Sequence, residues 1–313
     1  MRTIATAQAK FILSGEHFVV EGAPSVVIPA SCFTTQVQIV DKPEPGLTVS
    51  CSFDCEQPDL DRNRAEYESL VMRLVQMAAD MLDISLQGGG YKISVMSHIP
   101  PGQGAGSSSA LCQAIVEVLI KHFIIQECHP NYYQWFGNEL ENRWHGPVSG
   151  IDNAAVAWRR MIAYQRNKPL SFLSPGGPMF FVVGSVGMRK GTSPYQTFQW
   201  VRENQPLQFA AYRKVMEDNA TSLSRAICQG NLSVMGKLMN ESHQLFDAVG
   251  IVDAKANRAV KEALGCGALG ARMTGAGGGG FVIALVSVQH AEKLQLLWEK
   301  MGLSNIRLLH FGV

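Results

Sequence analysis

The chain has 313 residues, 46% of them hydrophobic and 17% charged. This composition supports a full core and excludes long disorder and a disulfide-stapled peptide. With 27 basic and 26 acidic residues the net charge is +1, which argues against a nucleic-acid partner. No apolar run reaches the roughly 18 residues needed to span a bilayer. The seven scattered cysteines suit reduced thiols. We therefore expect a soluble cytoplasmic protein with no membrane partner.

Strands and helices are mixed along the whole chain. Alternating polarity predicts strands at residues 35–40 and 91–95, and helical spacing predicts a helix over 67–81. Residues 107–123 predict a buried helix capped by hydroxyl side chains. A segment rich in Pro, Gly and Ser, residues 165–178, is the candidate linker. Helical spacing returns at 232–246 and 294–301, with strands predicted at 281–286 and 307–313. We expect two α+β domains, 1–168 and 175–313.

A glycine-rich loop leads into the helix predicted at residue 107. The loop reads IPPGQGAGSSSA, residues 99–110, with glycine at 102, 104 and 106. Backbone N–H groups at a helix N-terminus, together with the helix dipole, favour a phosphate. The loop lacks the lysine of a P-loop and the third glycine of a dinucleotide fingerprint. It is either a phosphate-binding loop or a flexible turn.

A second glycine run, GAGGGG at residues 275–280, is expected between a helix and a strand. Glycines are entropically costly to order. They therefore indicate either close approach to a ligand or a tight packing turn. Two such loops together suggest one polyphosphate ligand contacted from both halves of the chain.

The sequence ELENRWHGPVSGIDNAAV, residues 139–156, contains carboxylates that could divide two tasks. One could hold Mg²⁺ that bridges phosphates, and the other could accept a proton from a substrate hydroxyl. Taken alone, Glu141 is typical of an exposed helix residue and Asp152 of a turn or cap. Lys10 is typical of a surface lysine. If Lys10 lay near Asp152, it would keep that carboxylate ionised and stabilise an incipient alkoxide.

Three motifs, in this order, resemble those of the GHMP small-molecule kinases. They are AKFILSGEHFVVEG; IPPGQGAGSSSA followed by HGPVSGIDNAAV; and ALGARMTGAGGGGFVIAL preceded by MNESHQLFDAVGI. The resemblance covers residues 10–285. It implies an N-terminal ribosomal-protein-like α/β domain and a C-terminal ferredoxin-like domain with a cleft between them. It also implies ATP and Mg²⁺ as cofactors.

Within this family the motifs are most similar to those of mevalonate kinases, which implies transfer of phosphate to the primary hydroxyl of mevalonate. The alternatives are a family member acting on phosphomevalonate or a related acceptor, and a non-catalytic sensor with the same fold. Galactokinase is disfavoured because Phe18 and Val19 stand where its signature has Asp-Tyr. The oligomeric state, with a homodimer as one option, is left open.

The resemblance also implies roles for individual residues. Asp152 is the expected catalytic carboxylate and Lys10 its cationic partner, while Ser108 and Glu141 are expected to hold Mg²⁺. ATP is expected to contact Ser97, Gly102, Gln103, Gly104, Ala105, Gly106, Ser107, Ser108, Gly275 and Gly277. The acceptor is expected to contact Glu16, His17, Lys190 and Thr192, with Arg189 as an alternative source of positive charge. The chain departs from the family's usual Ala-Pro-Gly-Lys, because Ala7, Gln8 and Ala9 precede Lys10.

Overall fold

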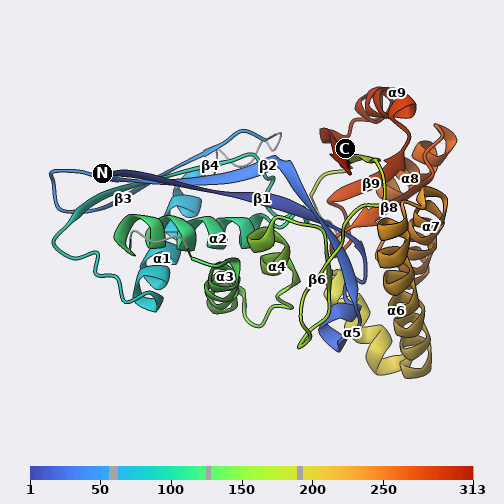
Figure 1. The fold of residues 1–313 in the computed structure, drawn as a ribbon, viewed down its shortest axis with the longest axis horizontal. Helices are drawn as coiled ribbons and strands as arrows, with labels where there is room; N and C mark the ends of the chain where they lie inside the picture. The colour runs from blue at the N-terminus through green and yellow to red at the C-terminus, as the bar shows by residue number, and fades with distance from the viewer. Residues whose placement is uncertain (56–62, 125–127, 189–192, 313) are drawn as a thin grey trace. The chain divides into compact units, whose positions relative to one another are not determined.

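The computed structural model describes residues 1–55, 63–124, 128–188 and 193–312 (Figure 1). These residues pack into two compact units. Unit 1 comprises Met1–Lys10, Pro29–Pro101 and Gly106–Arg159, and unit 2 comprises Phe11–Ile28, Gly102–Ala105 and Arg160–Val313. The units are not consecutive halves, because the long strands β1 (Arg2–Ser14) and β2 (Ser25–Asp41) each contribute to both. The domain limits 1–168 and 175–313 stay a prediction.

Unit 1 is a sheet covered by helices. Strand β4 (Gly90–Ser97) pairs in parallel with β3 (Gly46–Phe53) and antiparallel with β2, with Thr35 opposite Ser97. The helices lie on one side of these strands: α1 (Arg64–Met81), α2 (Ser107–Leu119), α3 (Pro130–His145) and α4 (Ile151–Trp158) (Figure 1). The two predicted strands and the predicted helix at 67–81 are thereby confirmed.

Helix α2 is the central helix of unit 1 and continues into a π-helical turn, η2 (Ile120–Ile124). The stretch Ser107–Ile124 is long and apolar enough to cross a membrane, which corrects the expectation that no apolar run reaches that length. Of this stretch 72% is buried inside the protein, as is typical of a core helix.

The cap predicted for α2 is wrong. Gly106, with a φ of 79°, is the N-cap, and no side chain makes a capping bond there. The hydroxyls of Ser108 and Ser109 donate to Glu141 instead.

Unit 2 contains a four-stranded antiparallel sheet in the order β10-β7-β9-β8. Its strands are β7 (Met179–Ser185), β8 (Gly270–Thr274), β9 (Phe281–Val286) and β10 (Ser304–Phe311). Two further short strands, β5 (Ile162–Tyr164) and β6 (Ser171–Phe172), extend the pairing of the first residues of β2. Strand β6 lies inside the segment expected to be a linker, and it pairs with β5, which precedes that segment.

The helices of unit 2 bury the apolar side chains of this sheet. They are η1 (Phe18–Glu21), α5 (Pro194–Asn204), α6 (Pro206–Gln229), α7 (Leu232–Val249), α8 (Ala254–Gly265) and α9 (Val288–Lys300). One core cluster joins α8 and α9 to the sheet around the fully buried Trp298. A second cluster joins η1, α5, α6 and α7 around Phe18 and Phe246.

The second glycine run does not follow a helix, as expected from the sequence, but connects β8 to β9. All five residues of β8 are buried, with Ala271 opposite Ala284. A short strand buried on both faces lacks polar alternation, so its pattern cannot be told from that of a buried helix.

Candidate functional site

A lysine and an aspartate form the centre of the candidate site in unit 1. Strand β1 places Lys10 so that its Nζ lies 2.9 Å from Oδ1 of Asp152, in the first turn of α4. The Lys10 side chain is 3% exposed and that of Asp152 is 32% exposed. Lys10 is therefore not the surface lysine that its local sequence suggests, and Asp152 is accessible to a ligand.

The start of α2 packs directly on this pair. A Cβ added at Gly106 would lie 2.9 Å from Cε of Lys10, so glycine leaves the space that the lysine stem occupies. The first turn of α2, with its unpaired backbone N–H groups, is thus held beside the Lys10–Asp152 pair. This brings together one predicted phosphate-binding residue and both predicted catalytic residues.

The carboxylate of Glu141, on α3, is surrounded by neutral donors. Its Oε1 accepts from Ser108 at 2.5 Å, and its Oε2 accepts from Ser109 at 2.7 Å and from Nδ2 of Asn153 at 2.6 Å. Glu141 is only 5% exposed, which contradicts its interpretation as an exposed helix residue. Glu139 is the more accessible of the two, with 36% of its side chain exposed, and it pairs with Arg143 at 3.1 Å.

The pair Ser108 and Glu141 fits a hard divalent cation. A carboxylate and a hydroxyl supply oxygen ligands, and Mg²⁺ usually takes one or two carboxylates together with phosphate and water oxygens. Among the described residues, no group of three or more His, Cys, Asp or Glu side chains could hold a metal ion by itself. The donor set therefore suits a cation that is shared with a bound phosphate.

Ser97, at the end of β4, has its hydroxyl engaged within unit 1. The hydroxyl lies 2.9 Å from that of Thr35 and accepts from the backbone N–H of Ile99 at 3.2 Å. With 2% of the residue exposed, this bonding fixes the turn that leads from β4 toward the glycine loop. A contact between Ser97 and ATP stays a prediction.

The two glycine loops contact each other within unit 2. A Cβ at Gly280 would lie 2.3 Å from the carbonyl oxygen of Gln103, and one at Gly275 would lie 3.2 Å from Cα of Gly104. Gln103 is buried, and its Oε1 accepts a hydrogen bond from Ser185. The loops at 102–105 and 275–280 therefore pack on each other, and their predicted contact with one polyphosphate ligand stays a prediction.

The backbone of the second loop is held within the protein. The N–H of Gly275 donates to Oε1 of Glu16 at 3.3 Å, and the N–H groups of Gly278 and Gly280 donate to the carbonyls of Ile251 and Gly187 at 2.8 Å. A Cβ at Gly277 would lie 2.6 Å from the Ile251 carbonyl oxygen. Packing alone thus explains several of these glycines. Direct contact of Gly275 and Gly277 with ATP stays a prediction.

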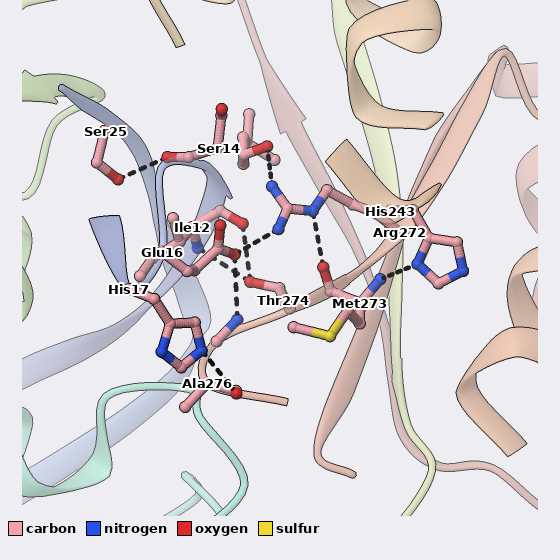
Figure 2. A network of polar contacts seen from close by, with 12 residues as sticks. Ile12, Ser14, Glu16, His17, Ser25, His243, Arg272, Met273, Thr274 and Ala276 are labelled. Atoms are coloured by element: carbon pink, nitrogen blue, oxygen red, sulfur yellow. Dashed lines mark hydrogen bonds and ion pairs between the residues drawn. The ribbon is translucent and has the colours of Figure 1, made fainter. Parts of the chain in front are cut away.

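Glu16 and Arg272 form a buried ion pair at the base of this loop (Figure 2). The pair lies at 2.7 Å, and Arg272 also donates to the backbone carbonyls of Met273 at 2.7 Å and of Leu13. Complete burial raises the pKa of Glu16, while the neighbouring Arg272 opposes that shift. The predicted contact of Glu16 with the acceptor stays a prediction. In this structure Glu16 positions the loop.

His17 lines a cavity of about 290 Å³ in unit 2, together with Tyr195, Phe198 and Arg202. Its ring stacks on Phe198 at 4.1 Å, and its Nε2 lies 2.8 Å from the carbonyl oxygen of Ala276, which accepts from it (Figure 2). His17 thus places a polar ring on the wall of a cavity, and its contact with the acceptor stays a prediction. Arg189, Lys190 and Thr192 lie outside the described residues.

Three residues of the site were missed in the sequence. Ser109 and Asn153 complete the environment of Glu141, and Arg272 anchors the second glycine loop. The available signals were a third consecutive serine, an amide beside Asp152, and a lone arginine in the apolar run that precedes the glycines. None of these signals is specific without the fold.

Two family models match the chain: the GHMP kinases N terminal domain over residues 69–160 and the GHMP kinases C terminal domain over 223–302. A mevalonate kinase of Thermococcus gammatolerans is 31% identical over 312 residues, covering 93% of this chain and 91% of the relative. The chain is therefore an ATP-using phosphotransferase with an alcohol group as acceptor. It belongs to the GHMP kinase family, as its motifs predict.

Solved structures show the same fold. A mevalonate kinase of L. major in complex with R-mevalonate matches with a TM-score of 0.86 and 24% identity, covering 99% of this chain and 95% of the other. The Methanococcus jannaschii mevalonate kinase matches with a TM-score of 0.82 and 22% identity, covering 99% of this chain and 98% of the other. The predicted two-domain α+β fold is thus confirmed.

Proposed function

We propose that this kinase transfers the terminal phosphoryl group of ATP to the primary hydroxyl of mevalonate, giving 5-phosphomevalonate. The observation that carries the proposal is the buried Lys10 paired with Asp152 at 2.9 Å beside the first turn of α2. The names of the similar proteins support mevalonate as the acceptor.

In this mechanism Asp152 orients the alcohol and accepts its proton. Lys10 fixes the carboxylate and provides a positive charge near the alcohol oxygen as that oxygen loses its proton. Positioning is the main contribution of the protein, because phosphoryl transfer passes through a loose transition state with charge on the equatorial oxygens.

The first turn of α2 and the loop at 102–108 would hold the phosphates through backbone N–H groups. Ser108 and Glu141 would hold Mg²⁺. When bound, Mg²⁺ neutralises charge on the phosphate oxygens. We also propose His17 as a contact of the acceptor, as the family resemblance implies. Seven cysteines without a disulfide suit a reducing compartment, so we place the enzyme in the cytoplasm.

The test is ADP release in a coupled assay with mevalonate, phosphomevalonate, galactose and homoserine as acceptors. We expect turnover with mevalonate and little with the other three. Turnover with phosphomevalonate instead would reassign the acceptor. Tight binding of ATP and mevalonate without ADP release would indicate a non-catalytic sensor.

The role of Asp152 is tested by Asp152→Asn. We expect kcat to fall by two to four orders of magnitude, roughly the contribution of a general base, with ATP affinity changed less than about threefold. The matched control is Asp218→Asn, because Asp218 is exposed on α6 and pairs only with Lys214 in the described part of the chain. Normal turnover of Asp152→Asn would reject the proposed role.

A further inference from the structure

Unit 1 contains a cavity that the proposed phosphoryl transfer does not use. Its volume is about 300 Å³, and it lies where α2 meets the start of α3 and the end of α4. The residues that give it chemical character are Gln113, Glu117, Lys121, Tyr133, Trp158 and Arg159. None of the described residues assigned above to ATP, Mg²⁺ or the acceptor lines it.

A buried glutamine without partners lines this cavity. Gln113 is 1% exposed, and neither its Nε2 nor its Oε1 makes a hydrogen bond. A buried amide without hydrogen bonds is destabilising, so native proteins rarely contain one unless it has a functional role. The opposing residue on α3 is Gly137, where a Cβ would lie 2.3 Å from Oε1 of Gln113. The fold therefore makes room for this amide.

The charged residues of the cavity carry one excess positive charge. Glu117 is 5% exposed, and its carboxylate accepts from Lys121 at 2.7 Å and from Arg159 at 3.0 Å. One carboxylate against two cations leaves a net charge of +1 on the lining. Both cations remain partly exposed, with 30% of the Lys121 side chain and 49% of the Arg159 side chain accessible.

Arg159 is fixed at the rim by the end of α4. It is the C-cap of that helix with a φ of 52°, a conformation that non-glycine residues seldom adopt. Its Nη2 also donates to the carbonyl of Thr6 at 2.8 Å. The guanidinium is therefore held in position before any ligand arrives, which reduces the entropy lost on binding.

The remaining wall offers one more donor and an apolar surface. The Tyr133 oxygen accepts from the N–H of Cys128 at 3.1 Å, and burial raises the Tyr133 pKa, so its hydroxyl retains a proton to donate. The indole N–H of Trp158 donates to Gln134 at 2.9 Å, which fixes the ring as part of the wall. Donors thus outnumber acceptors, and a negatively charged ligand fits best.

We propose that this cavity binds a small organic carboxylate that carries a hydroxyl group. The carboxylate would lie near Lys121 and Arg159. The amide of Gln113 is buried in this structure, so its side chain would turn toward the cavity to bond to the ligand hydroxyl, which would then satisfy its unpartnered atoms. This site does not rest on the function proposed above, because the described lining residues belong to neither the ATP site nor the acceptor site.

The probe for the test is 3-hydroxybutyrate, with neutral 3-hydroxybutyramide as its comparison, and neither experiment contains ATP. The readout is the indole N–H signal of Trp158 in an NMR titration, assigned with Trp158→Phe. We expect a saturable shift with the carboxylate, an affinity at least fivefold lower for the amide, and no shift in Gln113→Leu. Gln113→Glu keeps the side-chain volume and should also prevent binding, because it adds a negative charge.

Thermal unfolding without the probe separates this site from a structural role. Gln113→Leu removes two unsatisfied buried atoms, so we expect its Tm to rise by about 2 °C. Gln208→Leu, at an exposed position on α6, is the matched control and should shift Tm by less than about 1 °C. An unmoved Trp158 signal, or an equal shift in Gln113→Leu, would overturn the proposal. A lower Tm for Gln113→Leu would also overturn it, because an ordered water would then satisfy the amide.

Discussion

Asn153 fixes the orientation of the Glu141 carboxylate through a hydrogen bond. Its Nδ2 donates to Oε2 of Glu141 at 2.6 Å, and the residue itself is fully buried. A hydrogen bond to a charged group contributes about 1.5–3 kcal/mol. We expect Asn153→Ala to lower the free energy of unfolding by about 2 kcal/mol. Because Glu141 is then less constrained, the Mg²⁺ concentration for half-maximal turnover should also rise. Urea unfolding and a Mg²⁺ titration of turnover measure the two effects.

The matched control for this substitution is Asn204→Ala. Asn204 is exposed at the end of α5, where its side chain bonds to the Trp200 carbonyl at 2.9 Å. It should change the free energy of unfolding by less than about 0.5 kcal/mol and leave the Mg²⁺ titration unaltered. If Asn153→Ala behaved like Asn204→Ala in both measurements, Asn153 would have no positioning role.

Between elements, the packing of one glycine loop on the other is the feature most sensitive to substitution. The Cβ of Gly280→Ala would lie 2.3 Å from the carbonyl oxygen of Gln103, a backbone atom that cannot move without displacing its loop. The φ of 88° at Gly280 adds strain for any other residue. We expect a loss of about 3 kcal/mol in the free energy of unfolding and at least tenfold weaker ATP binding. Urea unfolding and calorimetric titration with ATP measure them.

Gly102→Ala separates the effect of contact from that of conformation. Gly102 has a φ of 72°, but a Cβ there would meet nothing within 4 Å. The substitution should therefore show only the conformational cost, about 1 kcal/mol. Equal losses for Gly102→Ala and Gly280→Ala would mean that the contact between the loops contributes nothing.

The elements with a clear period were predictable from the sequence, and those defined by long-range packing were not. Helix α1 and strands β2 and β4 follow the spacing of their apolar residues. Strand β8 was missed because all five of its residues are buried, which removes the alternation that marks a strand. The cap of α2 was missed because its serine hydroxyls bond to Glu141, 33 residues away in the case of Ser108.

The candidate site shows the same limit. From the sequence, the ion pair between Lys10 and Asp152 was only one possibility, because the number of residues between them does not determine their distance in the folded protein. The pairing of Glu16 with Arg272, 256 residues apart, had no local signal at all. The motif resemblance implied roles for Ser108 and Glu141, whereas the contacts of Ser109 and Asn153 with Glu141 became visible only in the fold.

At the scale of the whole molecule, unit 2 is built around an N-terminal segment. The backbone N–H of Ile12 donates to Oγ1 of Thr274 at 3.0 Å, across 262 residues, and Ser14 bonds to Asn219 at 2.8 Å. Residues 11–28 thus complete a core that otherwise comes from residues 160 onward. Contacts so distant in sequence bear a large loop-closure entropy, so this unit should form late in folding.

The stability of this core should depend on pH through His243 (Figure 2). Its Nδ1 accepts from the N–H of Met273 at 3.3 Å, and its Nε2 lies 2.9 Å from Oδ1 of Asn257, so the ring is neutral. Burial, aided by the positive charge of Arg272, lowers its pKa from 6.5 to about 4. Because the unfolded chain takes up a proton that the folded chain does not, stability is present above pH 6.5 and is lost as pH falls toward about 4.

The full lowering of the His243 pKa corresponds to roughly 3 kcal/mol in the free energy of unfolding. Between the two pKa values this free energy changes by about 1.4 kcal/mol per pH unit. We expect His243→Gln, which keeps an acceptor near Met273, to remove that slope from the wild-type profile in urea unfolding between pH 7.5 and 4.5. His310→Gln, at an exposed position on β10, is the control and should leave the profile unchanged.

The buried Glu16 acts in the opposite direction, because its raised pKa makes the folded state bind a proton more tightly. It is common to all three proteins, so the difference between the profiles isolates His243. Parallel profiles for the wild type and His243→Gln would show that this histidine does not couple folding to pH.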